Sequence, residues 1–319
     1  MYLQNFSSRI VNIIAGFLTD VLLGDPIYGH PISGFGICVN KLEQFIYSDK
    51  RTSGGFYVIL ILSTLIMFST ILNSCSWMNL LIVYISLGGT SLSETSVYMG
   101  KLLKANDIIG SRKLINSLCG RQSSLLNFSD LIRSTIESLA ENTSDAEVAP
   151  LVWLALAGNS GVLLYRGINT LDAMFGNYSN FYINFGWFAA KLDDIANFMP
   201  SHFTGLLTVL CSPITNGSPI KALLSWSRDF IYHPSLNAGI VEASFAGALK
   251  VRLGGPIQYS YRLEIRPTLG CKYHPLIPDL FRAINLSRTV QIFSVILLVL
   301  IIMVVDTYCR NEKKFYFEG

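Results

Sequence analysis

One long uncharged stretch limits the possible folds of this chain more than any other feature. No Asp, Glu, Lys or Arg occurs from Thr52 to Ser93, and this length allows two helical crossings of a bilayer, each of about 20 residues. The whole chain is 51% hydrophobic and only 14% charged, whereas an ordinary soluble domain is about 25% charged. The sequence therefore predicts a mainly α, polytopic α-helical membrane protein.

The uncharged runs locate the predicted spans within a single membrane domain, 1–319. Four segments are predicted to cross the membrane: about 10–23, 55–72, 77–93 and 289–306. Two more apolar segments, about 148–165 and 195–220, are interrupted by Gly or Pro, and the second contains Pro200. We expect broken or re-entrant helices there. Non-helical backbone at membrane depth survives only where it is buried in protein or lines a cavity, so these breaks indicate a site.

The distribution of basic residues predicts which way the chain faces. Lys and Arg concentrate in 41–51, 101–133 and 250–288, and the positive-inside rule places such loops in the cytoplasm. We expect a multi-pass protein of the cell membrane, in contact with lipid, whose polar loops and site face the cytoplasm. A net charge of +3 does not indicate a nucleic-acid partner. The six scattered cysteines support neither a disulfide framework nor a zinc cluster.

An acidic face precedes the first broken segment. Glu137, Glu141 and Asp145 follow one another at four-residue spacing on a predicted helix. Carboxylates at this spacing repel each other by about 0.2–0.5 kcal/mol per pair, so we expect a cation beside them. Mg²⁺, which is held by a few carboxylates and often bridges phosphates, is the favoured candidate, with Glu141 and Asp145 as its ligands. An arginine is the alternative.

Short polar segments elsewhere supply further candidate residues. Pro31 holds the residue before it outside the helical region, so His30 is presented from a stiff loop. Arg252 is a cation close to the glycine pair Gly254 and Gly255. Backbone N–H groups at such a pair can approach an anion. Asp172 is, with His30 and the acidic face, a catalytic candidate. The candidates for substrate or phosphate binding are Asp25, Asn142, Arg166, Asn169, Asn237, Arg252, Gly254 and Gly255. Helix capping and ordinary turns are the alternative roles for many of these residues.

These segments, in this order, resemble the CbiB/CobD family of cobalamin biosynthesis, the adenosylcobinamide-phosphate synthases. The matching blocks are GDPIYGHP (24–31), ESLAENTSDAEVAPLVW (137–153), YRGINTLDAMFG (165–176), FGWFAAKLDDIANFMP (185–200), HPSLNAG (233–239) and EASFAGALKVRLGGP (242–256). The chain departs from the family pattern at Gln122, Leu236 and Lys250, where the family commonly has aspartate, proline and glycine.

The resemblance implies an ATP-dependent ligase that forms an amide bond. It would join the carboxylate of adenosylcobyric acid to (R)-1-aminopropan-2-ol or to its O-phosphate, with Mg²⁺ and ATP, and could associate with other enzymes of the corrinoid pathway. No phosphate-loop motif occurs in the chain, so ATP is implied by the resemblance alone. The residues expected to act are the acidic face, the cations Arg166 and Arg252, and His30 or Glu147 as the base.

A secondary transporter of a small charged metabolite is the alternative function. Hydrophobic segments broken at polar residues are what a binding site at the membrane midplane requires, and carboxylates within the membrane can relay protons. The absence of a sequence repeat argues against it. An ATP-dependent corrinoid product would exclude transport as the main activity.

Overall fold

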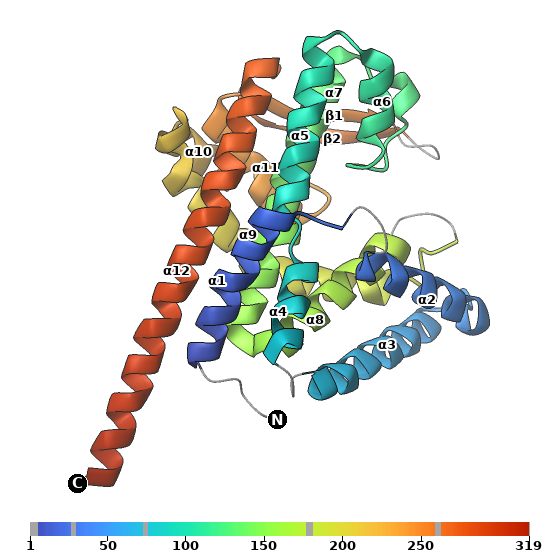
Figure 1. The fold of residues 1–319 in the computed structure, drawn as a ribbon. Coiled ribbons are helices and arrows are strands. Elements are labelled where there is room, and N and C mark those ends of the chain that lie inside the picture. The colour runs from blue at the N-terminus through green and yellow to red at the C-terminus, as the bar shows by residue number, and fades with distance from the viewer. Residues whose placement is uncertain (1–5, 27–29, 73–75, 177–180, 259–262, 319) are drawn as a thin grey trace. The chain divides into compact units, whose positions relative to one another are not determined.

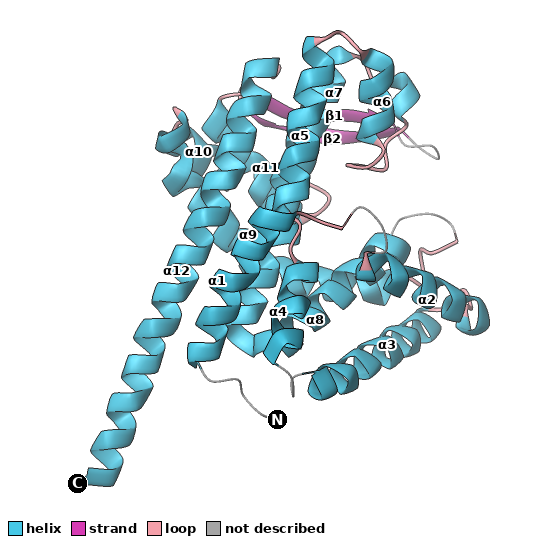
Figure 2. Ribbon diagram, in the orientation of Figure 1, coloured by secondary structure: helices cyan, strands magenta, loops and turns pink. Residues whose placement is uncertain are grey.

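The computed structural model describes residues 6–26, 30–72, 76–176, 181–258 and 263–318 (Figure 1). It is 81% helical, with two strands among the described residues (Figure 2). The α-helices are α1 (Phe6–Leu23), α2 (Pro31–Ile46), α3 (Arg51–Leu72), α4 (Ser76–Ser86), α5 (Gly89–Lys104), α6 (Ile108–Ile115), α7 (Phe128–Thr143), α8 (Ala149–Phe175), α9 (Trp187–Cys211), α10 (Pro219–Asp229), α11 (Leu236–Leu249) and α12 (Ile277–Glu318). The strands are β1 (Arg252–Gln258) and β2 (Leu263–Gly270). The shorter elements are the 3₁₀ turns Ser123–Leu125, Ser212–Thr215 and Phe230–Tyr232, and the π-helical turn Ser144–Val148.

Five helical segments of the described chain are long and apolar enough to cross a membrane, by length and composition. They are Phe6–Leu23, Arg51–Leu72, Trp77–Lys104, Phe128–Phe175 and Ile277–Asn311. Each of the four spans predicted from the sequence falls within one of them. The mainly α, polytopic fold is therefore confirmed.

The single domain predicted from the sequence corresponds to two compact units. The first unit contains residues 1–87, 149–193 and 292–319, and the second contains residues 88–148 and 194–291. Two helices, α9 and α12, contribute residues to both units. The apolar helices α1, α3, α4 and α8 belong to the first unit, and the hairpin β1–β2 with α7, α10 and α11 belongs to the second.

Helix α8 is the centre of the first unit, where it packs against α1, α3 and α4. A glycine allows one of these close approaches. A Cβ atom added at Gly167 would lie 2.4 Å from Cδ1 of Leu65 on α3, so a larger side chain would have to displace the end of the Leu65 side chain. Small residues at helix interfaces allow such close packing within a membrane.

The predicted break in the first apolar segment is confirmed. Gly158 has φ 67° and ψ −159° inside α8, a conformation that glycine adopts without a steric penalty. The break removes helical partners from the carbonyls before it. Arg9 of α1 compensates, because its NH1 atom donates to the carbonyls of Ala155 at 2.8 Å and Leu156 at 3.0 Å. A helix break within an apolar segment thus keeps its hydrogen bonds inside the protein.

An asparagine cluster completes this break. Nδ2 of Asn12 donates to Oδ1 of Asn159 at 3.2 Å, and Nδ2 of Asn159 donates to Oδ1 of Asn79 at 2.7 Å. Asn159 is buried. The amide groups at the break therefore bond to one another and connect α1, α4 and α8.

In the second apolar segment, 195–220, the helix ends later in the chain than Pro200 would suggest. Helix α9 runs through Pro200 and ends at Cys211. The chain then forms the 3₁₀ turn Ser212–Thr215 and passes through Asn216, whose φ of 56° is left-handed. A break occurs within 195–220 as predicted, but its position is set by the residues after Cys211 rather than by Pro200.

The second unit is built around a hairpin that the sequence did not predict. β1 and β2 pair antiparallel, with an irregular register between Gly254 and Pro256. β1 contacts α7 and α11, and β2 contacts α10 and α11. Both Gly254 (φ 75°) and Gly255 (φ 92°) have positive φ. This glycine bulge brings the backbone of β1 close to the side chains of α7.

Candidate functional site

Helix α7 holds the predicted acidic face. The helix begins with a capping box, in which Oδ1 of Asn127 accepts from the backbone N–H of Asp130 at 2.9 Å and Asp130 accepts in return. Such a box satisfies two backbone donors at a helix start. Glu137 and Glu141 lie one turn apart on α7, as predicted, and Asp145 follows in the π-helical turn.

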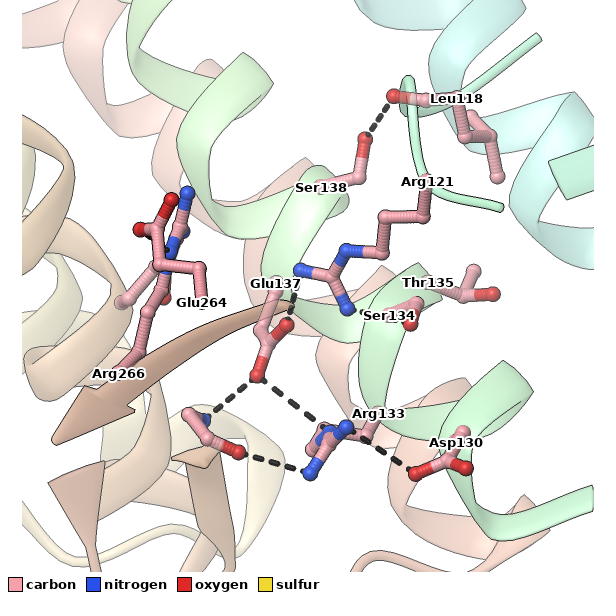
Figure 3. A network of polar contacts seen from close by, with 12 residues as sticks. Leu118, Arg121, Asp130, Arg133, Ser134, Thr135, Glu137, Ser138, Glu264 and Arg266 are labelled. Carbon is pink, nitrogen blue, oxygen red and sulfur yellow. Dashed lines mark hydrogen bonds and ion pairs between the residues drawn. The ribbon is translucent and has the colours of Figure 1, made fainter. Parts of the chain in front are cut away.

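Glu137 is enclosed by cations and backbone. Only 1% of its surface is exposed. Oε2 bonds to NH2 of Arg121, Oε1 accepts from the backbone N–H of Gly254 at 2.6 Å, and Oε1 lies 3.9 Å from Nε of Arg133 (Figure 3). Burial alone lowers the pKa of Arg121, but the adjacent Glu137 reverses this and raises it. The cation expected beside the acidic face is, at Glu137, an arginine.

Arg133 connects the same carboxylate to the hairpin. Its NH1 donates to the carbonyl of Gly254 at 2.8 Å, its NH2 donates to the carbonyl of Pro256 at 3.1 Å, and NH2 also lies 3.0 Å from Oδ1 of Asp130. The glycine bulge does present an N–H group to an anion, as the sequence predicted, but in this structure the anion is the carboxylate of Glu137.

Glu141 differs from Glu137 in exposure and in partners. Its side chain is exposed, and it has no hydrogen bond or ion pair within the described residues. Arg266 and Arg121 still act on it electrostatically, and Arg266 is in turn paired with Glu264, with Nε 2.9 Å from Oε1. Glu141 is therefore a solvent-accessible carboxylate beside a group of buried charges, free to bind a ligand.

Two buried titratable groups adjoin this carboxylate. His233 and Glu242 are 5% and 2% exposed, and Nε2 of His233 lies 3.7 Å from Oε2 of Glu242. Burial, reinforced by the charges of Glu137 and Glu141, raises the pKa of Glu242 well above its usual range. Burial therefore shifts Glu242 toward its neutral form relative to a carboxyl in water.

The contacts of His233 favour one tautomer. NH1 of Arg266 lies 3.3 Å from Nε2, whereas Nδ1 lies 2.7 Å from the carbonyl and 3.2 Å from the N–H of Ser235. Because a guanidinium can only donate, Nε2 accepts and Nδ1 donates through its shorter contact to the Ser235 carbonyl, which leaves no lone pair on Nδ1 for the Ser235 N–H. Burial and, next, the charge of Arg266 lower the pKa of His233 to about 4.

We expect His233 to make stability depend on pH. Its pKa is about 4 in the folded chain and about 6.5 when unfolded, so between these values the unfolded state binds more protons. Stability therefore rises with pH across this window and falls as pH decreases through it, by up to about 3 kcal/mol. Thermal unfolding of the wild type and of His233→Asn at pH 4.5 and 7 measures the effect. Equal pH dependence in the two proteins would contradict it.

The remaining predicted residues of the second unit have local partners. Asn142 donates to the carbonyl of Ser138 at 2.9 Å. Asn237 lies in the first turn of α11, donates to the carbonyl of Asp194 at 2.8 Å and accepts from Ser201 at 3.1 Å, so both ends of its amide are used within the protein.

Arg252 and Glu147 differ in whether their side chains are available to a ligand. Arg252 lies half-buried on β1, and its guanidinium has no hydrogen bond or ion pair within the described residues, so it can meet an anion. Glu147 is buried and accepts from the N–H of Gly89, at the start of α5, at 3.1 Å. A carboxylate at a helix N-terminus is stabilised there, so Glu147 is not the unpaired base that the sequence suggested.

The first unit gathers a second group of predicted residues. Nε2 of His30 lies 3.8 Å from Oδ1 of Asp25, and Nδ1 of His30 caps α2 by accepting from the N–H of Ile32 at 3.2 Å. Burial lowers the pKa of His30, Asp25 opposes this shift, and Arg166 adds to it. The free base of the imidazole is therefore favoured.

Helix α8 supplies the other members of this group. NH1 of Arg166 lies 3.4 Å from Oδ1 of Asn169, and Nδ2 of Asn169 lies 3.5 Å from Oδ1 of Asp193. Asp172 follows one turn later and is half-buried. The structure thus places the predicted residues in two groups, one in each unit, and Tyr28 and its two neighbours in the 24–31 block lie outside the described residues.

The acidic face fits Mg²⁺ only in part. No group of three or more His, Cys, Asp or Glu side chains in the described chain could hold a metal ion. Glu137 is occupied by Arg121 and Arg133, whereas Glu141 is exposed. Magnesium needs only one or two carboxylates when substrate phosphates and water complete its shell. Of the two remaining residues, Glu141 is exposed, whereas Asp145 already has a partner in the described chain.

Several residues of this site were not singled out from the sequence. They are Arg121, Arg133, His233, Glu242, Glu264 and Arg266. Two had a local signal: Arg133 stands four residues before Glu137, the spacing of a helical ion pair, and Glu242 is a lone carboxylate in a run of small apolar residues. Arg121 and Arg266 had none, because tertiary contacts bring them to the carboxylates: Arg121 from the segment between α6 and α7, and Arg266 from β2.

Comparison with known proteins identifies the family. The family profile described as CobD/Cbib protein matches residues 13–287. A Mycobacterium tuberculosis protein named cobalamin biosynthesis protein CobD is 44% identical over 308 residues, covering 95% of this chain and 98% of its own. Proteins of the same name from Rhodobacter capsulatus and Clostridium tetani are 35% and 31% identical, each covering 89% of this chain and at least 94% of their own. No solved structure matches detectably. The chain belongs to the CobD/CbiB family, as its motifs predicted.

Proposed function

We propose that this chain acts in cobalamin biosynthesis as an enzyme that forms an amide bond. It joins the carboxylate of adenosylcobyric acid to the amine of (R)-1-aminopropan-2-ol or of its O-phosphate, with ATP and Mg²⁺. The family membership of residues 13–287 supports the pathway. The observation that carries the chemistry is Glu141, an exposed residue on which Arg266 and Arg121 act electrostatically and whose carboxylate has no hydrogen bond or ion pair in the described chain.

The reaction requires activation, because a carboxylate is a poor electrophile. A substrate carboxylate oxygen takes the γ-phosphoryl group and ADP leaves. The amine nitrogen then attacks the carbonyl carbon, the carbon–oxygen bond to phosphate breaks, and the nitrogen loses a proton. Glu141 and Asp145 would hold Mg²⁺, which would supply charge neutralisation at the phosphates. Cationic side chains stabilise the negative charge that develops in such a step.

Residues of this chain are available for the other roles. We assign the amine proton to His30, whose neutral imidazole is favoured by burial. The lone pair of that imidazole lies on Nδ1, so taking the proton replaces the hydrogen bond from the N–H of Ile32. The cations assigned to anionic groups of the substrates are Arg166 in the first unit and Arg252 in the second. Asn142 of the second unit and Asp172 of the first are assigned to orienting the reactants, whereas both ends of the Asn169 amide are used by Arg166 and Asp193. The polar groups of Asn237 and Gly254 are used within the protein, so we assign them no substrate contact.

Mass spectrometry of a defined reaction tests the proposed function. Detergent-purified protein is incubated with adenosylcobyric acid, Mg²⁺, ATP and either aminopropanol or its O-phosphate. We expect a corrinoid whose mass has increased by that of the amine less one water, formed only when ATP is present. Failure to form either product in a folded preparation would refute the reaction. The preferred amine also identifies the substrate form.

Transport of a small metabolite has less support in the structure. A midplane site requires polar groups at a helix break that are open to a ligand. At Gly158 the asparagine amides bond to one another, and Arg9 binds the carbonyls before the break. Uptake into proteoliposomes without product formation would favour the transporter.

We expect the two groups of candidate residues to face the cytoplasm, because both substrates are polar and made there. The free thiols of Cys38 on α2 and of Cys271 after β2 report on the first and second units. Variants that keep only one of these cysteines should resist an impermeant maleimide in intact cells and react after permeabilisation. Efficient labelling of either thiol from outside would contradict this orientation.

A further inference from the structure

A basic pocket lies in the second unit beside α10 and β2. It has a volume of about 710 Å³ and is lined by Lys221, Arg228, Asp229, Lys250, Lys272 and Tyr273, among others. This volume is within the range of about 300–1,000 Å³ that small-molecule sites occupy. All of the lining residues belong to one compact unit.

The positive charges that line this pocket exceed the negative charges of its lining residues. Its one acidic side chain, Asp229, pairs with Arg228 through contacts of 2.6 and 2.9 Å and also accepts from the N–H of Gly270 at 2.8 Å. The ammonium groups of Lys221, Lys250 and Lys272 are left without an ion pair or hydrogen bond in the described part of the chain. Three such cations around one cavity repel each other and favour an anion with several negative charges.

The backbone at one of these lysines supports a role in binding. Lys250 ends α11 with φ 62° and ψ 33°, a left-handed conformation that strains a residue with a Cβ atom and is most often occupied by glycine at this position of a helix end. Glycine would cap the helix without that strain. Residues held in such conformations concentrate at ligand sites, and here the strained residue directs a cation to the pocket.

Tyr273 adds a second kind of contact. Its side chain is 77% exposed at the pocket, which leaves an aromatic face open to solvent. A nucleobase can stack on such a face. A ligand with both a polyphosphate and a flat ring would therefore use the lysines and the tyrosine together.

We infer that this pocket binds the polyphosphate of a nucleotide, with Lys221, Lys250 and Lys272 as the cations that hold it. The inference rests on the proposed function in one respect, since that reaction requires ATP. The glycine bulge of β1, the anion site expected from the sequence, already binds Glu137.

Equilibrium binding of ATP to the detergent-purified full chain, without corrinoid or amine, tests the inference. We expect Lys221→Gln and Lys272→Gln each to weaken binding about tenfold, the ratio expected for one charge-assisted contact. Lys250→Gly should weaken binding similarly and leave the melting temperature equal or higher, because it relieves the left-handed strain. Lys113→Gln, on α6 in the same unit and outside the pocket lining, is the matched control and should bind as the wild type does.

Competition identifies the part of ATP that is bound. Inorganic triphosphate should displace ATP, adenosine should do so weakly, and binding should weaken with salt. Unchanged affinity in the three lysine variants, or displacement by adenosine and not by triphosphate, would overturn the inference. ATP binding is also measured in nanodiscs of anionic lipid and of neutral lipid. If binding is lost in anionic lipid but kept in neutral lipid, a lipid headgroup is the occupant of the pocket and the inference is overturned.

This design separates the pocket from the reaction. A protein that binds ATP through the three lysines but forms no corrinoid product would refute the proposed function and retain the pocket. A protein that forms product at wild-type ATP dependence in all three variants would retain the function and refute the pocket.

Discussion

Glu137→Gln should lower the free energy of unfolding by about 3–5 kcal/mol, the range found when one partner of a buried ion pair is removed. The substitution keeps the shape of the side chain but strands Arg121, which is 8% exposed, without its counter-charge. It also weakens the contacts to Arg133 and to the N–H of Gly254. Thermal and denaturant unfolding in detergent measure the loss.

A matched variant and a double variant complete this test. Glu141→Gln makes the same chemical change one turn later on α7, at an exposed position, and should change stability by less than about 1 kcal/mol. Arg121→Met combined with Glu137→Gln should recover part of the lost stability, because no unpaired charge then remains buried. If Glu137→Gln melts with the wild type, the arginine pair is not what holds α7 against the hairpin.

Glu141→Gln should leave the protein folded and reduce product formation by about 100-fold or more. Loss of a positioned acid–base group or metal ligand has effects of this size. The side chain stabilises nothing in the described chain through a hydrogen bond or ion pair, so its removal leaves packing intact. The corrinoid assay and the melting temperature are measured on the same preparation.

The dependence on Mg²⁺ distinguishes the roles of Glu141. Asp145→Asn should retain more activity than Glu141→Gln, with half-maximal turnover shifted to higher Mg²⁺, if both residues share the ion. A well-folded Glu141→Gln protein with near-normal turnover would exclude Glu141 from the site. A variant that is folded and inactive at every Mg²⁺ concentration would favour a proton-transfer role over metal binding.

The apolar helices could be predicted because their signal is local. The length of the uncharged run Thr52–Ser93 is enough to predict two spans. The break at Gly158 is predicted by the glycine itself. Proline is a weaker local signal. Helix α9 continues through Pro200, so the position of the break in 195–220 depended on the turn after Cys211.

The hairpin β1–β2 could not be predicted from local sequence signals. Its strands contain two prolines and three glycines with positive φ, residues that are unusual in a strand interior. It forms because it packs on α10 and α11 and because α7 supplies Arg133 and Glu137 to its backbone groups. Of these partners, α11 directly precedes β1 in the sequence, whereas α7 and α10 are more distant along the chain.

The sequence by itself determined the membrane class of the protein, its family, and the shared helical face of Glu137 and Glu141. Each of these depends on residue type and short-range spacing. Only the tertiary structure decided that the two carboxylates have different roles. Burial and the approach of Arg121 and Gly254 make Glu137 part of a structural ion pair, whereas Glu141 remains exposed. The free energy of a carboxylate depends on which charges surround it and how far it is from water, and contacts between distant parts of the chain set both.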